Sequence, residues 1–442
     1  MKILFVSLGC DKNLVDTEMM LGLLNRDGHT FTDDENEADI IVINTCCFIN
    51  DAKEESINTI LEMAEYRESG NCKALIVTGC LAQRYQEEIE KEIPQVDAII
   101  GTTAIDEIVA ALEEILAGQK QNHYEDINAA PVTETNRVVT TGGHFEYLKI
   151  AEGCDKHCTY CIIPKVRGNY RSVPMESLIK EAKELADKGV RELILVAQET
   201  TLYGMDLYGK KELPRLLHEL AQIPGIYWIR ILYCYPEEIT DELIDAIAAE
   251  PKVCNYLDIP IQHASDNVLK RMGRRTNQAE LRAIIGKLRE KIPDICLRTT
   301  LISGFPGETQ EDFEELYRFV NEMEFDRLGV FPYSQEEDTP AATMEDQVPQ
   351  EVKEFRRDEL MELQQAIAFD KAEDMVGRIL TVMIEGKVAD EETYVARTYR
   401  DAPNVDGYLF VNTSANLMTG DLVKVLVTDS NEYDLIGEIY HE

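Results

Sequence analysis

Short apolar runs alternate with helical patterns along residues 1–117. We interpret the runs as strands, because short apolar segments bounded by turn residues are typical of buried strands. They lie at residues 1–8, 39–45, 73–78 and 97–100, with helical spacing at 13–25 and 52–67. Strands that alternate with helices predict a parallel, doubly wound α/β sheet.

The same rhythm returns from residue 145, after a segment without periodicity at 118–144 that we interpret as an exposed linker. Six further strands are predicted at residues 147–150, 193–197, 228–232, 256–259, 296–302 and 327–331. Helical patterns separate them, for example at 175–188 and 278–290, and a helix over 351–374 leads out. Six β-α units predict an open, partial (β/α)6 barrel, whose functional groups gather at the carboxyl ends of the strands.

From residue 375 the pattern changes to short alternating strands around glycines. These strands are predicted at 379–386, 408–412, 421–428 and 434–440. The alternation predicts a small antiparallel β-barrel or sandwich. The expected domains are therefore 1–117, 145–374 and 375–442, with the linker 118–144 between the first two.

Composition narrows the class of protein. The chain has 442 residues, with 44 basic and 83 acidic side chains and a net charge of −39. Such acidity repels phosphate backbones and attracts basic partners, unless it only aids solubility. No apolar run approaches the ~20 residues of a membrane span, and the first residues lack the apolar core of a signal peptide. Eleven cysteines in such a chain indicate a reducing cytoplasm, with thiols used as ligands.

Three cysteines share one short loop within residues 152–171, EGCDKHCTYCIIPKVRGNYR. They are Cys154, Cys158 and Cys161, in a C-x3-C-x2-C spacing with Tyr160 before the last. A zinc site would need a fourth ligand such as His157, whereas an iron–sulfur cluster held by three cysteines leaves one iron open. The spacing and the aromatic residue resemble the signature of radical S-adenosylmethionine (SAM) enzymes. Arg167 and Arg171 are expected to brace this loop.

A second group of cysteines follows successive strands of the first domain. Cys10, Cys46 and Cys80 each come directly after a predicted strand, and open α/β sheets gather their ligands at such carboxyl ends. We therefore predict a second iron–sulfur cluster with an open iron. Cys47 neighbours Cys46 and points to the opposite side, so Cys46 is favoured as the ligand. The remaining cysteines are expected in the core, namely Cys72, Cys234, Cys254 and Cys296.

Several motifs in one order resemble the radical-SAM methylthiotransferase family over essentially the whole chain. They read SLGCDKNLVDTE, INTCCFI, TGCLAQRY, EGCDKHCTYCIIPKVRG, PIQHASDNVL and LRTTLISGFPGET. The resemblance is greatest to the type that modifies an aspartate of a small-subunit ribosomal protein. In the tRNA-modifying type the first motif usually reads as a YGCQMN-like run. A small residue usually follows the second cysteine, where this chain has Cys47.

The resemblance implies a flavodoxin-like domain, a radical-SAM partial barrel and a terminal β-barrel of the TRAM type. It implies two 4Fe-4S clusters, one on each cysteine group, with SAM as a further cofactor and a reducing electron donor such as flavodoxin. An aliphatic C–H bond offers no acidic proton, so a cofactor must bring the chemistry while the protein positions it. Tyr160 belongs to the cofactor-binding signature.

Further SAM contacts are expected at the barrel strand ends. Gln198, Glu199 and Thr200 either hold the amine or ribose of SAM or shape the barrel edge. Arg298 pairs either with a carboxylate of SAM or substrate or with an acid inside the barrel. Gly304 lets the backbone approach the adenine, because glycine has no Cβ.

Three functions are consistent with these observations: a protein-modifying methylthiotransferase, a tRNA-modifying one, and a non-catalytic scaffold with zinc in the cysteine loop. Residues 375–442 carry 12 acidic and 5 basic side chains, whereas RNA-binding modules need Lys and Arg against phosphates. We therefore expect a basic ribosomal protein as the substrate and consider tRNA unfavourable.

Overall fold

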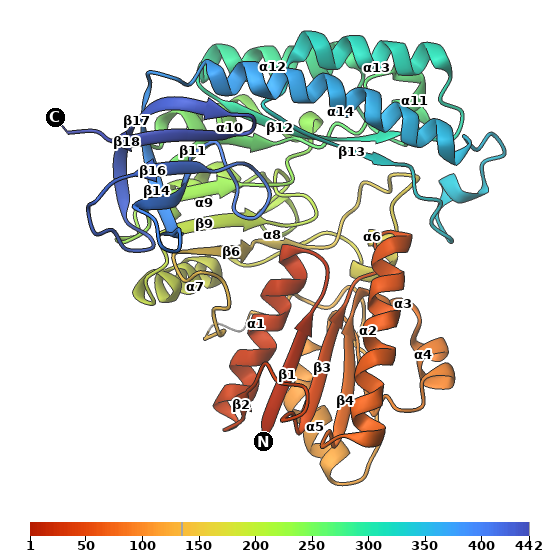
Figure 1. Ribbon diagram of the computed structural model, residues 1–442. Helices are drawn as coiled ribbons and strands as arrows, with labels where there is room; N and C mark the ends of the chain where they lie inside the picture. The colour runs from red at the N-terminus through yellow and green to blue at the C-terminus, as the bar shows by residue number, and fades with distance from the viewer. Residues whose placement is uncertain (134–135, 442) are drawn as a thin grey trace.

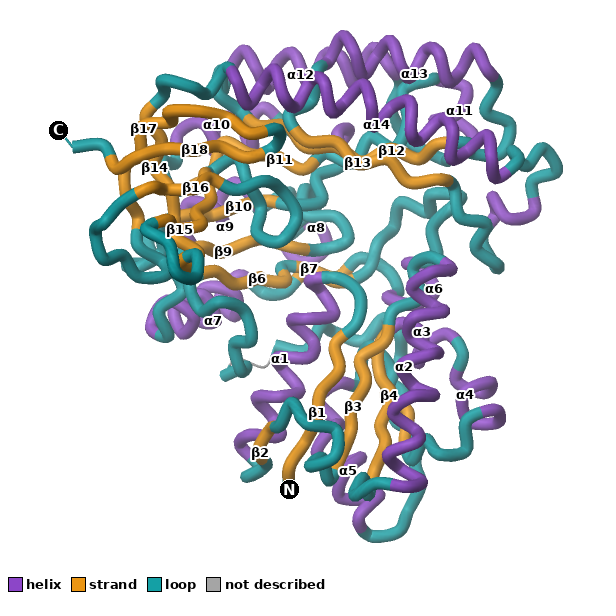
Figure 2. The backbone as a smooth tube through the Cα atoms, in the orientation of Figure 1, coloured by secondary structure: helices purple, strands orange, loops and turns teal. Residues whose placement is uncertain are grey.

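A computed structural model of the chain describes residues 1–133 and 136–441. An amino-terminal α/β domain lies below a larger barrel domain, and a small β-barrel closes one end of the latter (Figure 1). Strands and helices alternate through the first two parts, whereas the third is made of strands (Figure 2). None of the helices in the described ranges is long and apolar enough to cross a membrane.

The amino-terminal sheet has five parallel strands in the order β2-β1-β3-β4-β5. The strands are β1 (Lys2–Ser7), β2 (Thr30–Phe31), β3 (Ile40–Thr45), β4 (Ala74–Gly79) and β5 (Ala98–Ile100). This order is the flavodoxin-like one, so the predicted fold is confirmed. The two-residue β2 was not predicted, because so short a strand carries no pattern. Ser7 pairs with Asn44, and Thr45 with Gly79, so the strands carrying the predicted cysteine ligands end at one level.

Helices cover both faces of this sheet. They are α1 (Asp11–Arg26), α2 (Asn50–Ser69), α3 (Cys80–Arg84), α4 (Gln86–Glu92), η1 (Ile105–Glu107) and α5 (Ile108–Leu116). Alternate residues of β3 face two separate cores: Ile40 and Val42 pack with α1 and α5, while Ile41 and Ile43 pack with α2. All six residues of β3 are buried, and the first four are apolar because both faces of the strand are covered.

The barrel domain contains a six-stranded parallel sheet in the order β13-β12-β11-β10-β9-β6. Its strands are β6 (Phe145–Lys149), β9 (Glu192–Val196), β10 (Trp228–Ile231), β11 (Val253–Asp258), β12 (Cys296–Ser303) and β13 (Arg327–Pro332). The predicted partial barrel is confirmed. The largest boundary error is at β11, which begins three residues before the predicted strand because Val253 and Cys254 are buried within it.

The helices of the barrel domain lie mainly outside the sheet. They are α6 (Ile163–Arg167), α7 (Met175–Asp187), α8 (Met205–Tyr208), α9 (Leu213–Ala221), η2 (Pro236–Glu238), α10 (Asp241–Ala249), α11 (Asp266–Arg271), α12 (Gln278–Lys291), α13 (Gln310–Met323), η3 (Pro340–Thr343) and α14 (Gln350–Glu373). Figure 1 shows α12, α13 and α14 together along the outer side of β12 and β13. Loops, rather than these helices, therefore surround the carboxyl ends of the barrel strands.

The terminal domain is a closed barrel in the order β14-β15-β16-β18-β17. Its strands are β14 (Ile379–Lys387), β15 (Thr393–Thr398), β16 (Leu409–Asn412), β17 (Leu422–Asn431) and β18 (Asp434–Ile439). The predicted barrel is confirmed with two corrections. The β16–β18 pair is parallel, and β15 was missed because a charged residue, Arg397, occupies one of its buried positions.

The prediction of an exposed linker is wrong in part. The Arg137 side chain is only 1% exposed and lies 3.4–3.5 Å from carboxylates of Glu18, Glu146 and Glu181. His123 forms a parallel bridge with Ile100 at the edge of the amino-terminal sheet. This segment therefore helps to join the first domain to the barrel.

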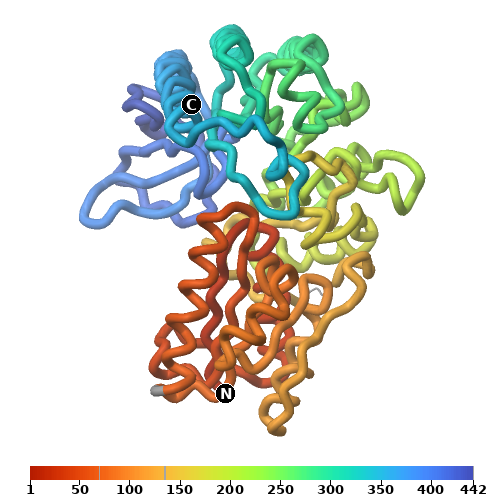
Figure 3. Tube along the Cα trace, turned by 90° about the vertical axis from the view of Figure 1, so that its right-hand side faces the viewer, coloured from red at the N-terminus to blue at the C-terminus, as the bar shows by residue number. Residues whose placement is uncertain are grey.

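A second connection comes from the loop after β13. It approaches the amino-terminal domain (Figure 3), where Glu337 accepts hydrogen bonds from Arg84 and Tyr85. Glu336, buried beside them, lies 2.8 Å from the Lys53 ammonium. The loop after β13 therefore also helps to fix the amino-terminal domain against the barrel.

Candidate active site

The loop with three cysteines is closed at its base by a short antiparallel pair, β7 (Ala151–Glu152) and β8 (Arg171–Ser172). The Cys154 amide donates to Gly168 O at 3.1 Å, and the Cys161 amide donates to Cys158 O at 3.0 Å. Cys154 and Cys158 are each 5% exposed. Burial raises the pKa of the Cys154 thiol to about 12, so a positive centre is needed to hold it as a thiolate.

His157 does not join these sulfurs. Its side chain is exposed and its backbone has φ +52°, so the residue turns outward while the cysteines on either side are buried. Across the described residues, no group of three or more His, Cys, Asp or Glu side chains is placed to hold a metal ion. Structural zinc needs a closed set of four ligands, and with His157 exposed the loop offers three thiols. The donor set of three thiols fits an iron–sulfur cluster better than zinc.

Aromatic and cationic side chains surround this loop, and the sequence analysis missed several of them. The Tyr235 hydroxyl lies 3.8 Å from Cys158 Sγ, and the Arg274 guanidinium stacks 4.3 Å from the Tyr235 ring centroid. Arg274 Nε and Nη1 are buried and lack hydrogen-bond partners. Lys156, inside the loop, is buried and paired with Glu238. Tyr235 and Arg274 lie outside any spacing motif, so only the fold brings them here.

Cys10, Cys46 and Cys80 come together at the carboxyl ends of β1, β3 and β4. Cys10 is the N-cap of α1 and Cys80 is the first residue of α3, and helix amino termini favour negatively charged groups such as thiolates. A Cβ at Gly9 would lie 2.7 Å from the Cys46 Cβ, so this close approach requires glycine. Cys46 and Cys80 are buried, whereas Cys10 is exposed. Three thiols at the ends of neighbouring strands again fit a cluster with three protein ligands.

Cys47 lies in the core together with the four cysteines that were predicted there. Cys47 is fully buried and belongs to the same apolar core as Ile43 and Leu75, whereas Cys46 faces Gly9. This arrangement supports the preference for Cys46. The four remaining cysteines are buried as well, namely Cys72, Cys234, Cys254 and Cys296.

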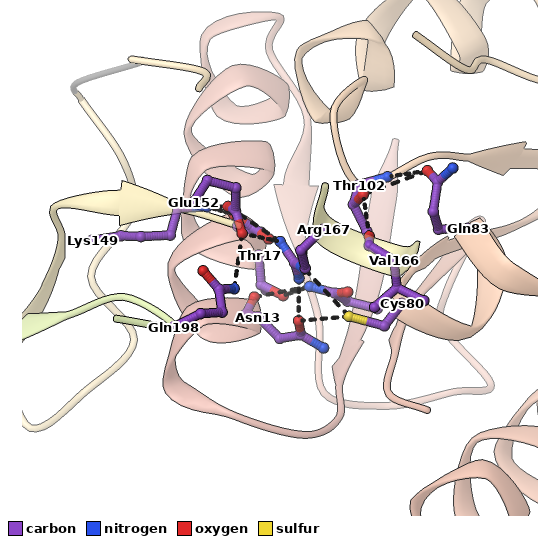
Figure 4. A network of polar contacts seen from close by, with 12 residues as sticks. Asn13, Thr17, Cys80, Gln83, Thr102, Lys149, Glu152, Val166, Arg167 and Gln198 are labelled. Carbon is purple, nitrogen blue, oxygen red and sulfur yellow. Dashed lines mark hydrogen bonds and ion pairs between the residues drawn. The ribbon is translucent and has the colours of Figure 1, made fainter. Parts of the chain in front are cut away.

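A buried polar network extends from Cys80 to Glu152, which lies two residues before Cys154 (Figure 4). The Arg167 side chain is 1% exposed, and its Nη1 donates to Asp16 Oδ2 at 2.7 Å. Lys149 pairs with Asp16 and lies 2.7 Å from Glu152 Oε2. Burial opposes charge here, but the neighbouring Cys80, Glu152 and Asp16 nevertheless raise the pKa of Arg167. Arg167 was expected only to brace the cysteine loop. Its bond to Asp16 of the amino-terminal domain was not predicted.

The predicted SAM contacts after β9 divide into two kinds. The Thr200 hydroxyl donates to Leu232 O at 2.7 Å, so it joins the ends of β9 and β10. Gln198 Nε2 donates to Glu152 Oε1 at 3.0 Å, and its Oε1 is buried without a partner. Glu199 is fully buried, which raises the pKa of its carboxyl to about 7, and its Oε2 also has no hydrogen bond. Gln198 and Glu199 therefore retain polar atoms for a ligand.

Arg298, Gly304 and Tyr160 have neighbours within the protein. Arg298 Nη1 lies 3.6 Å from Asp258 Oδ1, and its Nε lies 3.8 Å from Asp406 Oδ1 of the terminal domain. Gly304 has φ +67°, and a Cβ there would collide with the Lys353 side chain. Tyr160 packs edge-on against Phe305, with ring centroids 6.3 Å apart. Contacts of these three residues with SAM stay predictions.

Cys10, Cys46 and Cys80 are called the strand-tip cysteines below, and a cavity of about 560 Å³ lies beside the first of them. Its lining includes Cys10 and Asp11 from the first domain, Thr140 from the linker, Tyr147 from β6 and Glu385 from the terminal barrel. All parts of the chain thus meet around one space, and Cys10 faces it. A substrate segment of moderate size fits such a space.

Comparison with known proteins agrees with this arrangement. Residues 2–101 match the uncharacterized protein family UPF0004, residues 148–320 the radical SAM superfamily, and residues 376–439 the TRAM domain. Among solved structures, the chain resembles the radical SAM methyltransferase TsrM from Kitasatospora setae, with a TM-score of 0.56 and 12% identity over 89% of this chain and 80% of that one. It also resembles the cobalamin-dependent radical enzyme OxsB, with a TM-score of 0.51 and 14% identity over 83% and 56% of the two chains. These two likenesses concern the fold alone.

Sequence relatives are much closer. The chain is 65% identical over 437 residues, 99% of both chains, to a protein of Lachnoclostridium phytofermentans named ribosomal protein uS12 methylthiotransferase RimO. It is 50% identical to a protein of the same name from Acetivibrio thermocellus, over 100% of this chain and 99% of the relative. A third, from Clostridium botulinum, is 48% identical over 100% and 98%. The chain therefore belongs to the radical-SAM methylthiotransferase family, whose enzymes use SAM and 4Fe-4S clusters.

Proposed function

We propose that this enzyme adds a methylthio group to the β-carbon of an aspartate in the small-subunit ribosomal protein uS12. The observation that carries the proposal is the full-length identity of 65% to a relative named for that activity. The acidity of the chain, −39 in net charge, agrees with a basic protein substrate.

In this proposal the two cysteine groups divide the work. Bound SAM and iron–sulfur clusters supply the one-electron chemistry and the sulfur that an unactivated C–H bond requires. Cys154, Cys158 and Cys161 hold one cluster in a buried site, and Gln198 and Glu199 offer polar atoms beside it. The second cluster is held by Cys10, Cys46 and Cys80.

The second cysteine group borders the cavity through Cys10. The protein's own contribution is to orient the target carbon there and to keep solvent from the reacting groups. The polar network between the two cysteine groups holds them at a fixed separation, so that one bound segment can reach both.

The terminal barrel supports a protein substrate rather than RNA. Two of its five basic residues are directed into the molecule, because Arg397 contacts Glu192 and Arg400 contacts Asp326 of the barrel domain. Acidic residues such as Glu391, Glu392 and Glu432 are exposed. A phosphate backbone would meet repulsion at this surface, while a basic protein would be attracted.

The proposal extends to organisation and location. The units are residues 1–117, which hold the second cluster, 145–374 for the radical chemistry, and 375–442 for substrate binding, joined by the linker 118–144. A small reducing protein such as flavodoxin would supply the electron, and the enzyme would act in the cytoplasm beside the ribosome.

An anaerobic assay with ribosomes and bulk tRNA offered side by side tests the substrate. Mass spectrometry should find the methylthio group on an aspartate of uS12 and none in tRNA nucleosides. Methylthio groups in tRNA, with ribosomal proteins unmodified, would contradict the proposal.

Charge reversal on the terminal barrel tests the recognition surface. Glu391→Lys with Glu392→Lys should weaken binding of uS12 by about three- to tenfold at low salt, and less at high salt, because exposed charges contribute modestly and are screened. Glu242→Lys with Glu290→Lys is a matched control, since both residues are exposed on barrel helices. Equal weakening in the two double variants would show that only net charge matters.

A further inference from the structure

Arg167 belongs to the loop of Cys154, Cys158 and Cys161, but its buried side chain contacts Cys80, a predicted ligand of the cluster at the strand-tip cysteines (the strand-tip cluster). No other buried cation of that loop makes such a contact among the residues that the structure describes. Arg167 ends α6, six residues after Cys161, and Gly168 follows with φ +72°. The turn at Gly168 brings the chain back toward β8. The guanidinium consequently points across the domain boundary into the amino-terminal domain.

Each of its nitrogens has a partner there. Nε donates to Cys80 Sγ at 3.3 Å, Nη1 donates to Asp16, and Nη2 donates to the Asn13 side chain. Asn13 in turn donates to Leu8 O and Thr45 O, both at 3.0 Å, so it fixes the ends of the strands that precede Cys10 and Cys46. The planar fork of arginine can satisfy these three directions together, which the single ammonium of lysine cannot.

On the barrel side, the contacts of Arg167 extend to the start of the loop that carries Cys154, Cys158 and Cys161. Arg167 Nη1 lies 3.4 Å from the carboxylate of Glu152, two residues before Cys154. Glu152 also binds Lys149 and Gln198. The two cations and the two carboxylates, Asp16 and Glu152, balance in charge. The bond to Cys80 is therefore an additional interaction of the guanidinium with sulfur, beyond the ion pairs.

The other cysteine group has no equivalent bond. Of its three sulfurs, Cys158 Sγ has the Tyr235 hydroxyl at 3.8 Å, and no guanidinium hydrogen bond reaches any of the three within the described part of the chain. Hydrogen bonds and positive charge near cluster sulfurs stabilise the reduced, more negative state and thereby raise the reduction potential. Cationic side chains, Arg274 and Lys156, lie near the loop site as well, so the difference between the two sites is the direct N–H bond from Arg167 to Cys80.

We propose that Arg167 is a positioning residue with two effects. Its N–H bond to Cys80 raises the reduction potential of the strand-tip cluster, and its remaining contacts hold that cluster in a fixed position relative to the loop of Cys154, Cys158 and Cys161. This inference rests on membership of the family and its clusters, and not on the identity of the substrate. A wrong substrate assignment would leave the reduction potential as predicted.

The potential can be measured in the full-length chain with Cys154, Cys158 and Cys161 replaced by Ala, so that only the strand-tip cluster is reconstituted. Arg167→Gln should make reduction at least tenfold less favourable, which is 59 mV for a one-electron couple, in an anaerobic titration followed by electron paramagnetic resonance. Arg167→Lys, which keeps the charge but loses the fork, should give a smaller fall. If Arg167→Gln does not take up iron, the lysine variant decides.

Arg137→Gln is the matched control. Arg137 is equally buried and faces three carboxylates, but no contact with a cysteine is found for it among the described residues. It should lower thermal stability without changing the potential. An unchanged potential in an iron-replete Arg167→Gln protein, or an equal fall in Arg137→Gln, would overturn the proposal.

A second measurement, made in the intact enzyme, tests whether Arg167 fixes the position of the two sites relative to each other. Arg167→Lys should form more 5′-deoxyadenosine for each methylthio product, by at least threefold, because the two sites no longer hold the substrate in one register. Arg67→Lys should keep the wild-type ratio, because Arg67 pairs with Asp97 within the amino-terminal domain. The same ratio in the Arg167→Lys enzyme would refute the positioning role.

Discussion

Each of the two cysteine groups presents three thiols, but the backbone brings them together in different ways. Cys154, Cys158 and Cys161 lie on one loop, closed at its base by β7 and β8. Cys10, Cys46 and Cys80 come from three loops, and their proximity depends on the order and register of a whole sheet. The first site is thus a property of a local segment, and the second is a property of a folded domain.

The side chains around the two cysteine groups differ as well. The loop site is lined by Tyr160, Tyr235 and Arg274, which leave buried nitrogens of Arg274 without partners. At the strand-tip site Arg167 and Asn13 satisfy one another, but Asp11 Oδ2 and Asn44 Oδ1 are buried there without hydrogen-bond partners. Unpartnered buried groups are costly unless a ligand satisfies them. Both sites therefore retain buried polar atoms for a ligand, which include nitrogens of Arg274 at the loop site and oxygens of Asp11 and Asn44 at the strand-tip site.

The largest effect should come from the loop site. Cys158→Ala removes one of three cluster ligands, so 5′-deoxyadenosine formation should fall below detection in an anaerobic assay analysed by chromatography. The strand-tip site cannot compensate, because it lies in another domain. Normal SAM cleavage by this variant would show that the loop does not hold the reactive cluster.

Removing the other site should separate two steps. With Cys10, Cys46 and Cys80 all replaced by Ala, iron content should fall by about half and the methylthio product should disappear. SAM cleavage should persist. Cys47→Ala serves as the control and should retain most of the iron, since Cys47 lies in the apolar core. Unchanged iron in the triple variant would mean that these cysteines are core residues.

The contrast also explains what the sequence could predict. The cysteine loop could be predicted from its spacing, and β3 from the four consecutive apolar residues with which it begins. The strand-tip site needed only the inference that successive parallel strands end together. The contact of Arg167 with Asp16 joins residues 151 positions apart, and no pattern marks it. Likewise β15 was missed because Arg397, an inward-facing charge, finds its partner Glu192 in another domain.

A change at the junction should affect both sites. Asp16 lies between Lys149 and Arg167, so Asp16→Asn leaves two buried cations with one carboxylate. Breaking a buried ion pair by removing one partner costs about 3–5 kcal/mol. We expect a lower midpoint of thermal unfolding by calorimetry and less iron at both sites. Asp27→Asn, at a half-exposed position near His29, is the control. A loss of iron at one site alone would show that the network does not couple them.

The smallest effects should come from glycines that shape each site separately. Gly153 and Gly79 have φ +78° and +93°, and a Cβ at either would collide with backbone, of Asn169 and Thr45 respectively. Gly153→Ala should displace Cys154 and lower 5′-deoxyadenosine formation about tenfold, because strain at positive φ costs about 1–2 kcal/mol before any collision. Gly79→Ala should leave that rate within about twofold and lower the methylthio product instead. Gly143→Ala controls for positive φ alone, since a Cβ there, at φ +81°, meets nothing within 4 Å. If Gly79→Ala slows SAM cleavage as much as Gly153→Ala does, the two sites are not independent, and the distinction between a local loop and a domain-built site fails.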